Sequence, residues 1–201
     1  MKYELNQIIH ADCMDIMKDI PDKWFELAIV DPPYLDNVSG LNVGVNRNFK
    51  YNEFKQPDKE YFDELLRVSK NQIIWGFNYF IEKLKSSSGF ICWYKHQNGH
   101  FSECELAWTS IGNGKFYDRA YQKDIGNKIH PTQKPVALYR WLLQNYAKPG
   151  DKIIDTHSGS GSLACACHLE KFDFLAIEKD EDYYKSSVER LDILRSQGVL
   201  F

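Results

Sequence analysis

The stretch KIIDTHSGSGS, residues 152–162, decides the fold class of this chain. Two isoleucines lead into an aspartate, a turn with two glycines follows, and an Ala- and Leu-rich segment comes next. This order is typical of a strand, a tight turn and a helix. Glycines let the backbone approach a ligand closely, and the helix N-terminus favours a carboxylate or a phosphate. The stretch therefore predicts a small-ligand site in an α/β protein.

Short apolar runs elsewhere in the chain alternate with helical patterns. Apolar residues at helical spacing predict helices around 62–66, 138–142 and 184–191. A run at Glu103–Ser110 predicts an added strand, antiparallel to its predecessor. We expect a Rossmann-like, mostly parallel sheet with helices on both faces and one antiparallel strand. Six further strands are predicted at Gln7–His10, Glu26–Val30, Gln72–Trp75, Phe90–Trp93, Lys152–Asp155 and Phe174–Glu178.

Size and composition favour one soluble domain. The chain has 201 residues, of which 43% are hydrophobic, enough for a sizeable core. It shows no apolar run of membrane-spanning length and no signal-peptide core, so we expect a cytoplasmic protein. Its five cysteines lack paired spacing, which favours reduced structural thiols and no metal. Segments 35–56 and 111–134 follow no regular pattern.

Asp31-Pro32-Pro33-Tyr34 directly follows the apolar run at 27–30. The two prolines have no backbone donor, so the local carbonyls act as acceptors beside the Asp31 carboxylate. Together with an aromatic ring, these acceptors make a receptacle for a flat amine. A strand's end is also where α/β proteins place their binding sites.

Glu178 lies nineteen residues after Gly159, at the end of the next predicted strand. A carboxylate there can accept hydrogen bonds from both hydroxyls of an adenosine ribose. Two cofactors fit, a nicotinamide dinucleotide and S-adenosylmethionine. Residue 164 is alanine, so the full G-x-G-x-x-G pattern is absent, and a dinucleotide has no use for an amine clamp. Methyl transfer to an amine uses both sites.

The order of the motifs, with Asp31-Pro32-Pro33-Tyr34 before Asp155-x-x-x-Gly159-x-Gly161, resembles the β-type (permuted) amino-methyltransferases of DNA. Three further segments are similar to those of the family. Residues 7–13 resemble its adenine-binding segment, residues 75–80 its pocket wall, and residues 130–135 the segment that binds the cofactor's amino-acid end. The resemblance implies S-adenosylmethionine as cofactor, adenine N6 in DNA as substrate, and base flipping. It assigns catalysis to Asp31, Pro32, Pro33 and Tyr34, and cofactor binding to Asp12, Cys13, Asp31, Thr132, Lys134, Asp155, His157, Ser158, Gly159, Gly161, Ser162, Glu178 and Lys179.

Thr156, His157 and Ser162 depart from this family pattern, which usually has Pro, Phe and often Thr at these positions. The region where the family carries its target-recognition domain is short, spanning only residues 111–129. We therefore expect contacts mostly to phosphates, permissive recognition of sequence, and a homodimer that enlarges the DNA footprint. The expected phosphate contacts are Arg47, Lys50, Lys115, Arg119, Lys123 and Lys128.

Other functions stay open at this point. Cytosine N4 methylation needs the same amine clamp. A protein-glutamine or RNA-base methyltransferase would have a similar clamp, but those relatives generally place the glycine motif first. A non-catalytic nucleic-acid-binding module with a degenerate cofactor pocket is a third alternative, which the intact Asp31 and Glu178 disfavour.

Overall fold

A computed structural model of the chain describes residues 2–34, 55–97, 102–121 and 128–197. In this part of the chain, eight strands form one sheet in the order β1-β8-β7-β2-β3-β5-β4-β6. Strands far apart in the sequence are neighbours, since β7 lies between β2 and β8. The strands are β1 (Gln7–His10), β2 (Phe25–Val30), β3 (Ser69–Trp75), β4 (Gly89–Tyr94), β5 (Cys104–Thr109), β6 (Lys115–Asp118), β7 (Lys152–Asp155) and β8 (Asp173–Glu178).

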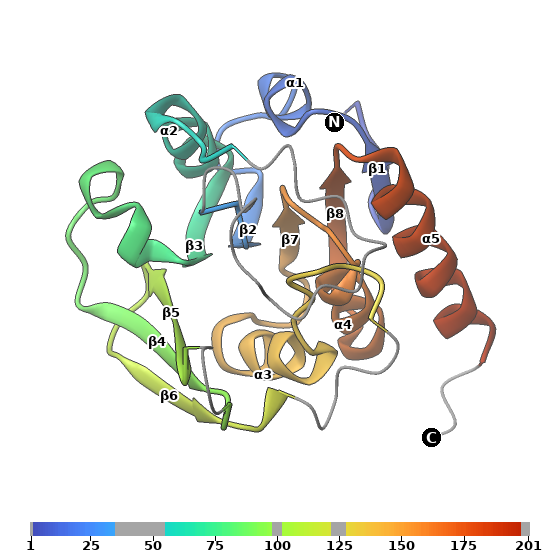
Figure 1. Cartoon of the computed structure of the whole chain (residues 1–201). Coiled ribbons are helices and arrows are strands. Elements are labelled where there is room, and N and C mark those ends of the chain that lie inside the picture. Colours follow the sequence, from blue (N-terminus) through green and yellow to red (C-terminus); the bar gives the residue numbers. More distant parts are fainter. Residues whose placement is uncertain (1, 35–54, 98–101, 122–127, 198–201) are drawn as a thin grey trace.

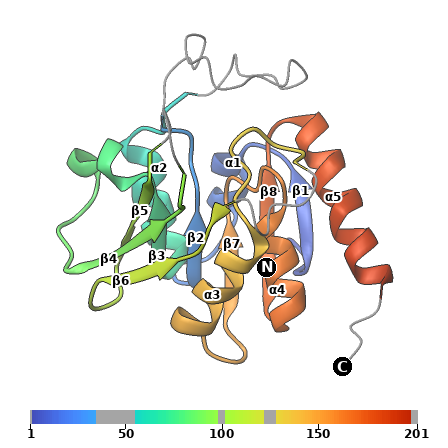
Figure 2. The same ribbon diagram turned by 60° about the horizontal axis from the view of Figure 1, so that its bottom comes forward.

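Helices cover the sheet on both faces (Figures 1 and 2). Figure 1 shows α1 and α2 on one face and α3 and α4 on the other, while α5 runs beside β1. Two short 3-10 helices, η1 and η2, follow β3. The bounds are α1 (Cys13–Lys18), α2 (Lys59–Val68), η1 (Phe77–Tyr79), η2 (Ile81–Lys83), α3 (Val136–Tyr146), α4 (Ser162–Glu170) and α5 (Glu181–Ser196).

Alternation of side chains along the central strands gives the protein two hydrophobic cores. In β2, Leu27 and Ile29 point into the core shared with α3, α4 and α5, whereas Ala28 and Val30 face α1 and α2. Successive residues of a strand point to opposite faces, so a strand covered on both sides is apolar throughout. This arrangement confirms the predicted doubly covered sheet.

Strand directions also agree with the sequence-based prediction. Within the described residues, β5 runs antiparallel to β3 and to β4, and every other pair of neighbouring strands is parallel. The expectation of a patternless segment at 111–134 is wrong in one place, because β6 pairs there in parallel with β4. This strand escaped detection because it is a four-residue edge strand with only Tyr117 buried.

None of the helices in the described ranges has the length and apolar character needed to cross a membrane.

Candidate active site

The carboxyl ends of the parallel strands bring the predicted site residues to one edge of the sheet. Asp31 follows β2, Asp155 ends β7 and Glu178 ends β8, and these three strands are adjacent. The helices that follow β2 and β7 cover opposite faces of the sheet. Ligands of open α/β sheets bind at such a switch point. Motifs more than a hundred residues apart thus share one site.

Asp31 is held by a buried lysine. Lys134 Nζ lies 2.5 Å from Asp31 Oδ2, and Lys134 itself is only 4% exposed. The other carboxylate oxygen, Oδ1, is buried and has no hydrogen-bond partner. Burial raises the pKa of Asp31 above its usual value, although the Lys134 cation opposes this shift. One oxygen of the carboxylate is therefore occupied and the other is available to a ligand.

Tyr34 lies in an aromatic stack beside this carboxylate. Its ring stacks on Tyr79 with centroids 4.9 Å apart and planes 15° from parallel. Gly76 lies against the same ring, because a Cβ built there would be only 2.6 Å from Tyr34 Cδ1. Gly76 also has φ +71°, a conformation that glycine adopts without strain. Together these contacts place a flat, half-buried ring at the site.

The glycine turn and Glu178 are in direct contact. Gly159 N donates to Glu178 Oε2 at 2.6 Å, and Asp180 N donates to Oε1 at 2.9 Å. Burial raises the pKa of Glu178. Gly159 and Gly161 have φ values of +51° and +69°, which permits the tight turn into α4. The turn therefore offers a ligand both an accessible backbone and the Glu178 carboxylate.

Pairing of β1 with β8 brings a second acidic group next to this turn. His10 is in register with Glu178, so the residues that follow both strands are neighbours. Asp12 caps α1 through Met14 N and accepts from Lys179 Nζ at 2.9 Å. That hydrogen bond lowers the pKa of Asp12, while burial raises the pKa of Cys13 to about 12. Cys13 is thus an uncharged thiol at this position.

The segment before α3 covers the glycine turn. Ser162 Oγ donates to the Lys134 carbonyl at 2.8 Å, which ties this segment to the start of α4. The His130 ring packs edge-on against Tyr183 and lies over Gly159. Thr132 Oγ1 is 3.2 Å from His130 Nδ1, and Ser158 Oγ is buried without a partner. Thr132 and Ser158 are therefore close to the turn, whereas the Lys134 side chain points to Asp31.

Thr156 and His157, which depart from the family pattern, belong to a polar cluster with Tyr61 of α2. Tyr61 Oη lies 2.6 Å from Thr156 Oγ1, which in turn lies 3.0 Å from His157 Nδ1. His157 N donates to Asp155 Oδ1 at 3.1 Å. Burial lowers the pKa of His157 to about 4 and raises the pKa of Asp155 to about 8. The imidazole is therefore neutral at neutral pH.

Replacing His157 by phenylalanine should make stability less dependent on pH. The pKa of His157 falls from 6.5 to about 4 on folding, so below about pH 6.5 the unfolded chain binds the proton first. Native stability therefore drops as pH falls toward 4, by up to about 1.4 kcal/mol per pH unit for each such group. Urea unfolding of both proteins at pH 7, 6 and 5 measures this slope. An equal slope in the variant would contradict the assignment.

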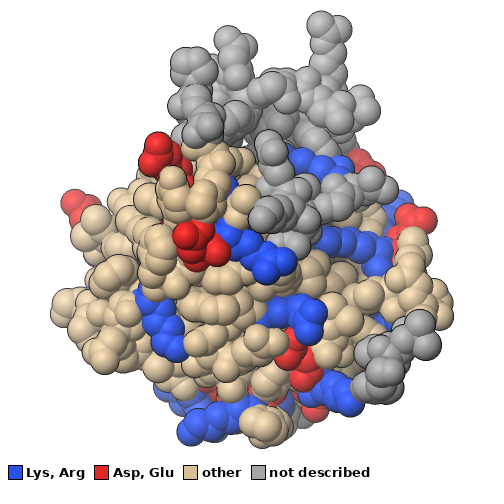
Figure 3. Space-filling view, turned by 90° about the horizontal axis from the view of Figure 1, so that it is seen from below, with Lys and Arg blue, Asp and Glu red and all other residues tan. Residues whose placement is uncertain are grey.

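The structure describes three of the six cations expected at phosphates. Lys115 Nζ donates to Asn145 Oδ1 of α3 at 2.7 Å, and the backbone carbonyl of Arg119 accepts a hydrogen bond from Trp93 Nε1. Lys128 is exposed, with its Nζ 6.0 Å from the centroid of the Tyr121 ring. Figure 3 shows Lys and Arg spread over one face between acidic and uncharged residues. Arg47, Lys50 and Lys123 lie outside the described residues. DNA contact by these residues stays a prediction.

Sequence reasoning missed Glu105 and Lys95. Glu105 lies in β5, and its carboxylate contacts Lys134 Nζ at 3.1 Å and Lys95 Nζ at 2.8 Å. Although burial opposes it, these two lysines hold the pKa of Glu105 below its usual value. A glutamate within a mostly apolar strand was the one available signal.

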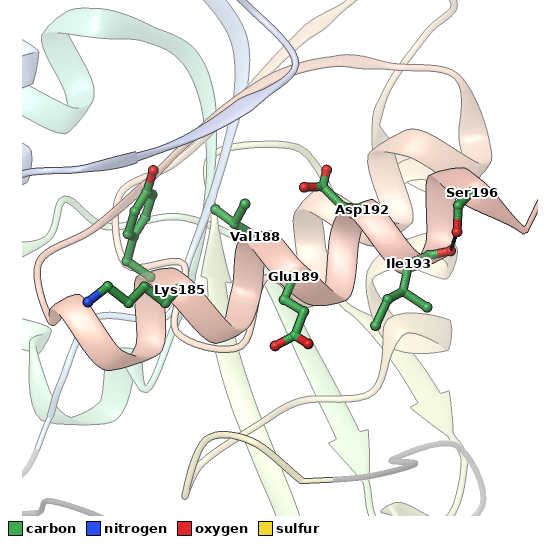
Figure 4. Close-up of a pocket in the computed structure, with 7 residues that line it drawn as sticks. Lys185, Val188, Glu189, Asp192, Ile193 and Ser196 are labelled. Carbon is green, nitrogen blue, oxygen red and sulfur yellow. Dashed lines mark hydrogen bonds between the residues drawn. The ribbon is translucent and has the colours of Figure 1, made fainter.

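A groove on α5 is separate from this site. It has a volume of about 550 Å³, and every residue that lines it comes from α5 (Figure 4). Tyr184, Val188 and Ile193 form its apolar part. None of its lining residues is among the predicted site residues, so the groove adds nothing to the candidate active site.

Comparisons with known proteins agree with this geometry. A family model described as DNA methylase matches residues 94–189, which include the glycine turn and Glu178. The type II methyltransferase M.HpaI of Haemophilus parainfluenzae is 23% identical, over 92% of this chain and 74% of that protein. Both matches are thus to proteins described as DNA methylases or methyltransferases. One of the structural matches, M1.HpyAVI, is a complex with S-adenosylmethionine.

Two solved structures establish the fold at low sequence identity. The M1.HpyAVI–SAM complex superposes with a TM-score of 0.62 at 22% identity, covering 92% of this chain and 98% of that one. The PvuII DNA methyltransferase (cytosine-N4-specific) gives a TM-score of 0.66 at 11% identity, covering 94% and 91%. The fold predicted from the sequence is thus confirmed.

The residues of the glycine turn fit S-adenosylmethionine. Gly159 and Gly161 have no side chain and a positive φ, which gives the tight turn that a nucleoside cofactor needs at the end of a strand. The buried Ser158 hydroxyl lacks a partner, so a polar ligand group would satisfy it. Glu178 supplies a carboxylate at the same turn, within hydrogen-bond distance of Gly159 N.

Proposed function

We propose that this protein methylates the exocyclic N6 amine of adenine in DNA, after the base has left the duplex. The observation that carries the proposal is the buried, unpartnered Oδ1 of Asp31 beside the Tyr34 ring. This acceptor lies on the same sheet edge as a turn that fits S-adenosylmethionine. The arrangement provides for a flat amine and a methyl donor together.

The chemistry follows from the acceptors at Asp31 and Pro32. An adenine amine is a poor nucleophile because its lone pair is delocalised into the ring. Asp31 Oδ1 and the Pro32 carbonyl accept its two N–H groups, while Tyr34 stacks on the base. When bound, S-adenosylmethionine supplies an electrophilic methyl group on a sulfonium. Catalysis then depends mainly on positioning and electrostatics, and Asp31 accepts the proton after transfer.

The remaining site residues would hold the cofactor. Glu178 would bind the ribose hydroxyls, and Asp12, Cys13 and Lys179 would contact the adenine. The turn from Asp155 to Ser162, with Thr132, would hold the methionine part. In this assignment the neutral imidazole of His157 takes the place of the phenylalanine ring that the family usually has at this position.

Cytosine N4 is the second candidate substrate. It presents an amine with the same two N–H groups, and the PvuII structure named above is cytosine-N4-specific. The clamp at Asp31 serves either base. A product assay therefore has to decide between the two.

Incubation of unmethylated DNA with labelled S-adenosylmethionine, followed by nucleoside analysis, tests the proposal. We expect N6-methyladenine, and mapping of the modified positions should show a short or loosely defined target. N4-methylcytosine alone would overturn the substrate assignment. Transfer to RNA or protein but not to DNA would overturn the proposed function. Light scattering with and without DNA tests the proposed homodimer.

Replacing Glu178 by alanine should weaken S-adenosylmethionine binding at least tenfold. Each lost charge-assisted hydrogen bond is worth about 1.5–3 kcal/mol, and about 1.4 kcal/mol corresponds to a factor of ten. Isothermal titration measures the Kd. Glu181→Ala is the matched control, because Glu181 is exposed in the first turn of α5 and should leave the Kd unchanged. A wild-type Kd in the Glu178 variant would contradict the ribose assignment.

A further inference from the structure

Four side chains of alternating charge form a continuous chain from Asp31 into the protein. Lys134 Nζ contacts Asp31 Oδ2 at 2.5 Å and Glu105 Oε2 at 3.1 Å. Lys95 Nζ contacts the other Glu105 oxygen at 2.8 Å. Both lysines are buried, at 4% and 7% exposure. Isolated buried charges are costly, so this arrangement depends on every member of the chain.

The chain makes the two oxygens of Asp31 different. Lys134 occupies Oδ2, whereas Oδ1 is buried without a partner. Lys134 cannot easily leave, because Glu105 holds its ammonium group from another side and the Trp75 ring lies 5.3 Å from it. Glu105 is itself fixed by its position in β5, opposite Trp93 of β4. The rotation of the Asp31 carboxylate is therefore set by Lys134, which residues of β3 and β5 hold in place.

We propose that Lys134 is a positioning residue for Asp31: held by Glu105, it fixes the carboxylate so that Oδ1 receives the amine of the substrate base. This inference rests on the proposed function and deepens it. It assigns the Lys134 side chain to the catalytic aspartate instead of the cofactor's carboxylate, the role implied by the family resemblance.

The charges around Asp31 give the direction of the expected pKa change. Burial raises the pKa of Asp31, Lys134 and Lys95 lower it, and Glu105 raises it. Replacing Lys134 removes the nearest cation. The pKa-raising effect of burial on Asp31 is then no longer opposed by a positive charge in direct contact. The pKa of Asp31 should therefore rise, and a protonated Asp31 cannot accept the amine through a charged oxygen. Other ionisable groups coupled to Asp31 are Tyr34, Tyr61, Tyr139 and Asp155.

Lys134→Met tests the proposal in the full chain. Carbon-13 NMR titration of the Asp31 carboxyl, without DNA or cofactor, should show its pKa raised by about 1–3 units, the usual effect of losing an adjacent opposite charge. The acid limb of the kcat–pH profile should move up with it. At pH 7, kcat should fall about 10²-fold or more. The Kd for S-adenosylmethionine should stay within a factor of about two, which is well below the tenfold change that about 1.4 kcal/mol would cause.

Lys134→Met could unfold the protein because it leaves two buried carboxylates with one lysine. The double variant Lys134→Met with Glu105→Gln keeps the charges balanced and should fold, with kcat as low as in the single variant. Lys152→Met is the matched control. Lys152 also pairs with a carboxylate, Glu26, but at the start of β7, so kcat should not change.

Three outcomes would overturn the inference. One is a kcat of the double variant close to wild type. The second is an Asp31 pKa that does not rise in the folded Lys134 variant. The third is a variant with normal kcat and a Kd for S-adenosylmethionine raised tenfold, which would return Lys134 to the cofactor. If the wild type methylated no DNA, the proposed function would fail instead, and the NMR titration would still decide whether Lys134 controls Asp31.

Discussion

Replacing Asp31 by asparagine should lower kcat for methyl transfer about 10²–10⁴-fold, the range for loss of a positioned acid–base or electrostatic group. Asparagine has the same shape as aspartate but presents no carboxylate to the amine, and it cannot accept the proton that methyl transfer releases. Single-turnover methylation of a DNA duplex measures the effect.

The fold should survive this change, because Asp31 follows the end of β2 and contributes no apolar surface to either core. Lys134 keeps Glu105 as a partner in the variant. Asp63→Asn, on the exposed face of α2, is the matched control and should retain wild-type kcat. A fully active Asp31 variant would remove the basis of the proposed mechanism.

Gly76→Ala should raise the KM for DNA about tenfold and also reduce stability by about 1–2 kcal/mol. The stability cost arises because a residue with a Cβ is strained at positive φ. The effect on KM arises because the new Cβ, 2.6 Å from Tyr34 Cδ1, pushes this ring off its stack on Tyr79. Stacking of one base on an aromatic side chain is worth about 1–3 kcal/mol.

Gly150→Ala separates the two effects. Gly150 also has a positive φ, +89°, but a Cβ there would meet no atom within 4 Å. This variant should lose comparable stability in urea unfolding while its KM stays at the wild-type value. Equal KM values for the two variants would show that Tyr34 does not stack on the base.

The amino-acid pattern was sufficient for most of the fold. β1 matches the predicted range Gln7–His10 residue for residue, and β5 runs antiparallel as expected. Both predictions rest on short apolar runs. The length of such a run and its content of β-branched residues indicate a buried strand. β6 was missed because an edge strand buries little and so carries little pattern.

The sequence by itself determined which groups are proposed to carry the chemistry: Asp31 with its prolines and Tyr34, the glycine turn, and Glu178. Each lies at a strand end, where a local motif and its neighbouring strand can be recognised together. Only the tertiary structure decided that β7 lies between β2 and β8, and that Lys134 and Glu105 meet Asp31. Strand order and ion pairs depend on contacts between distant segments, and no local periodicity encodes which buried lysine faces which carboxylate.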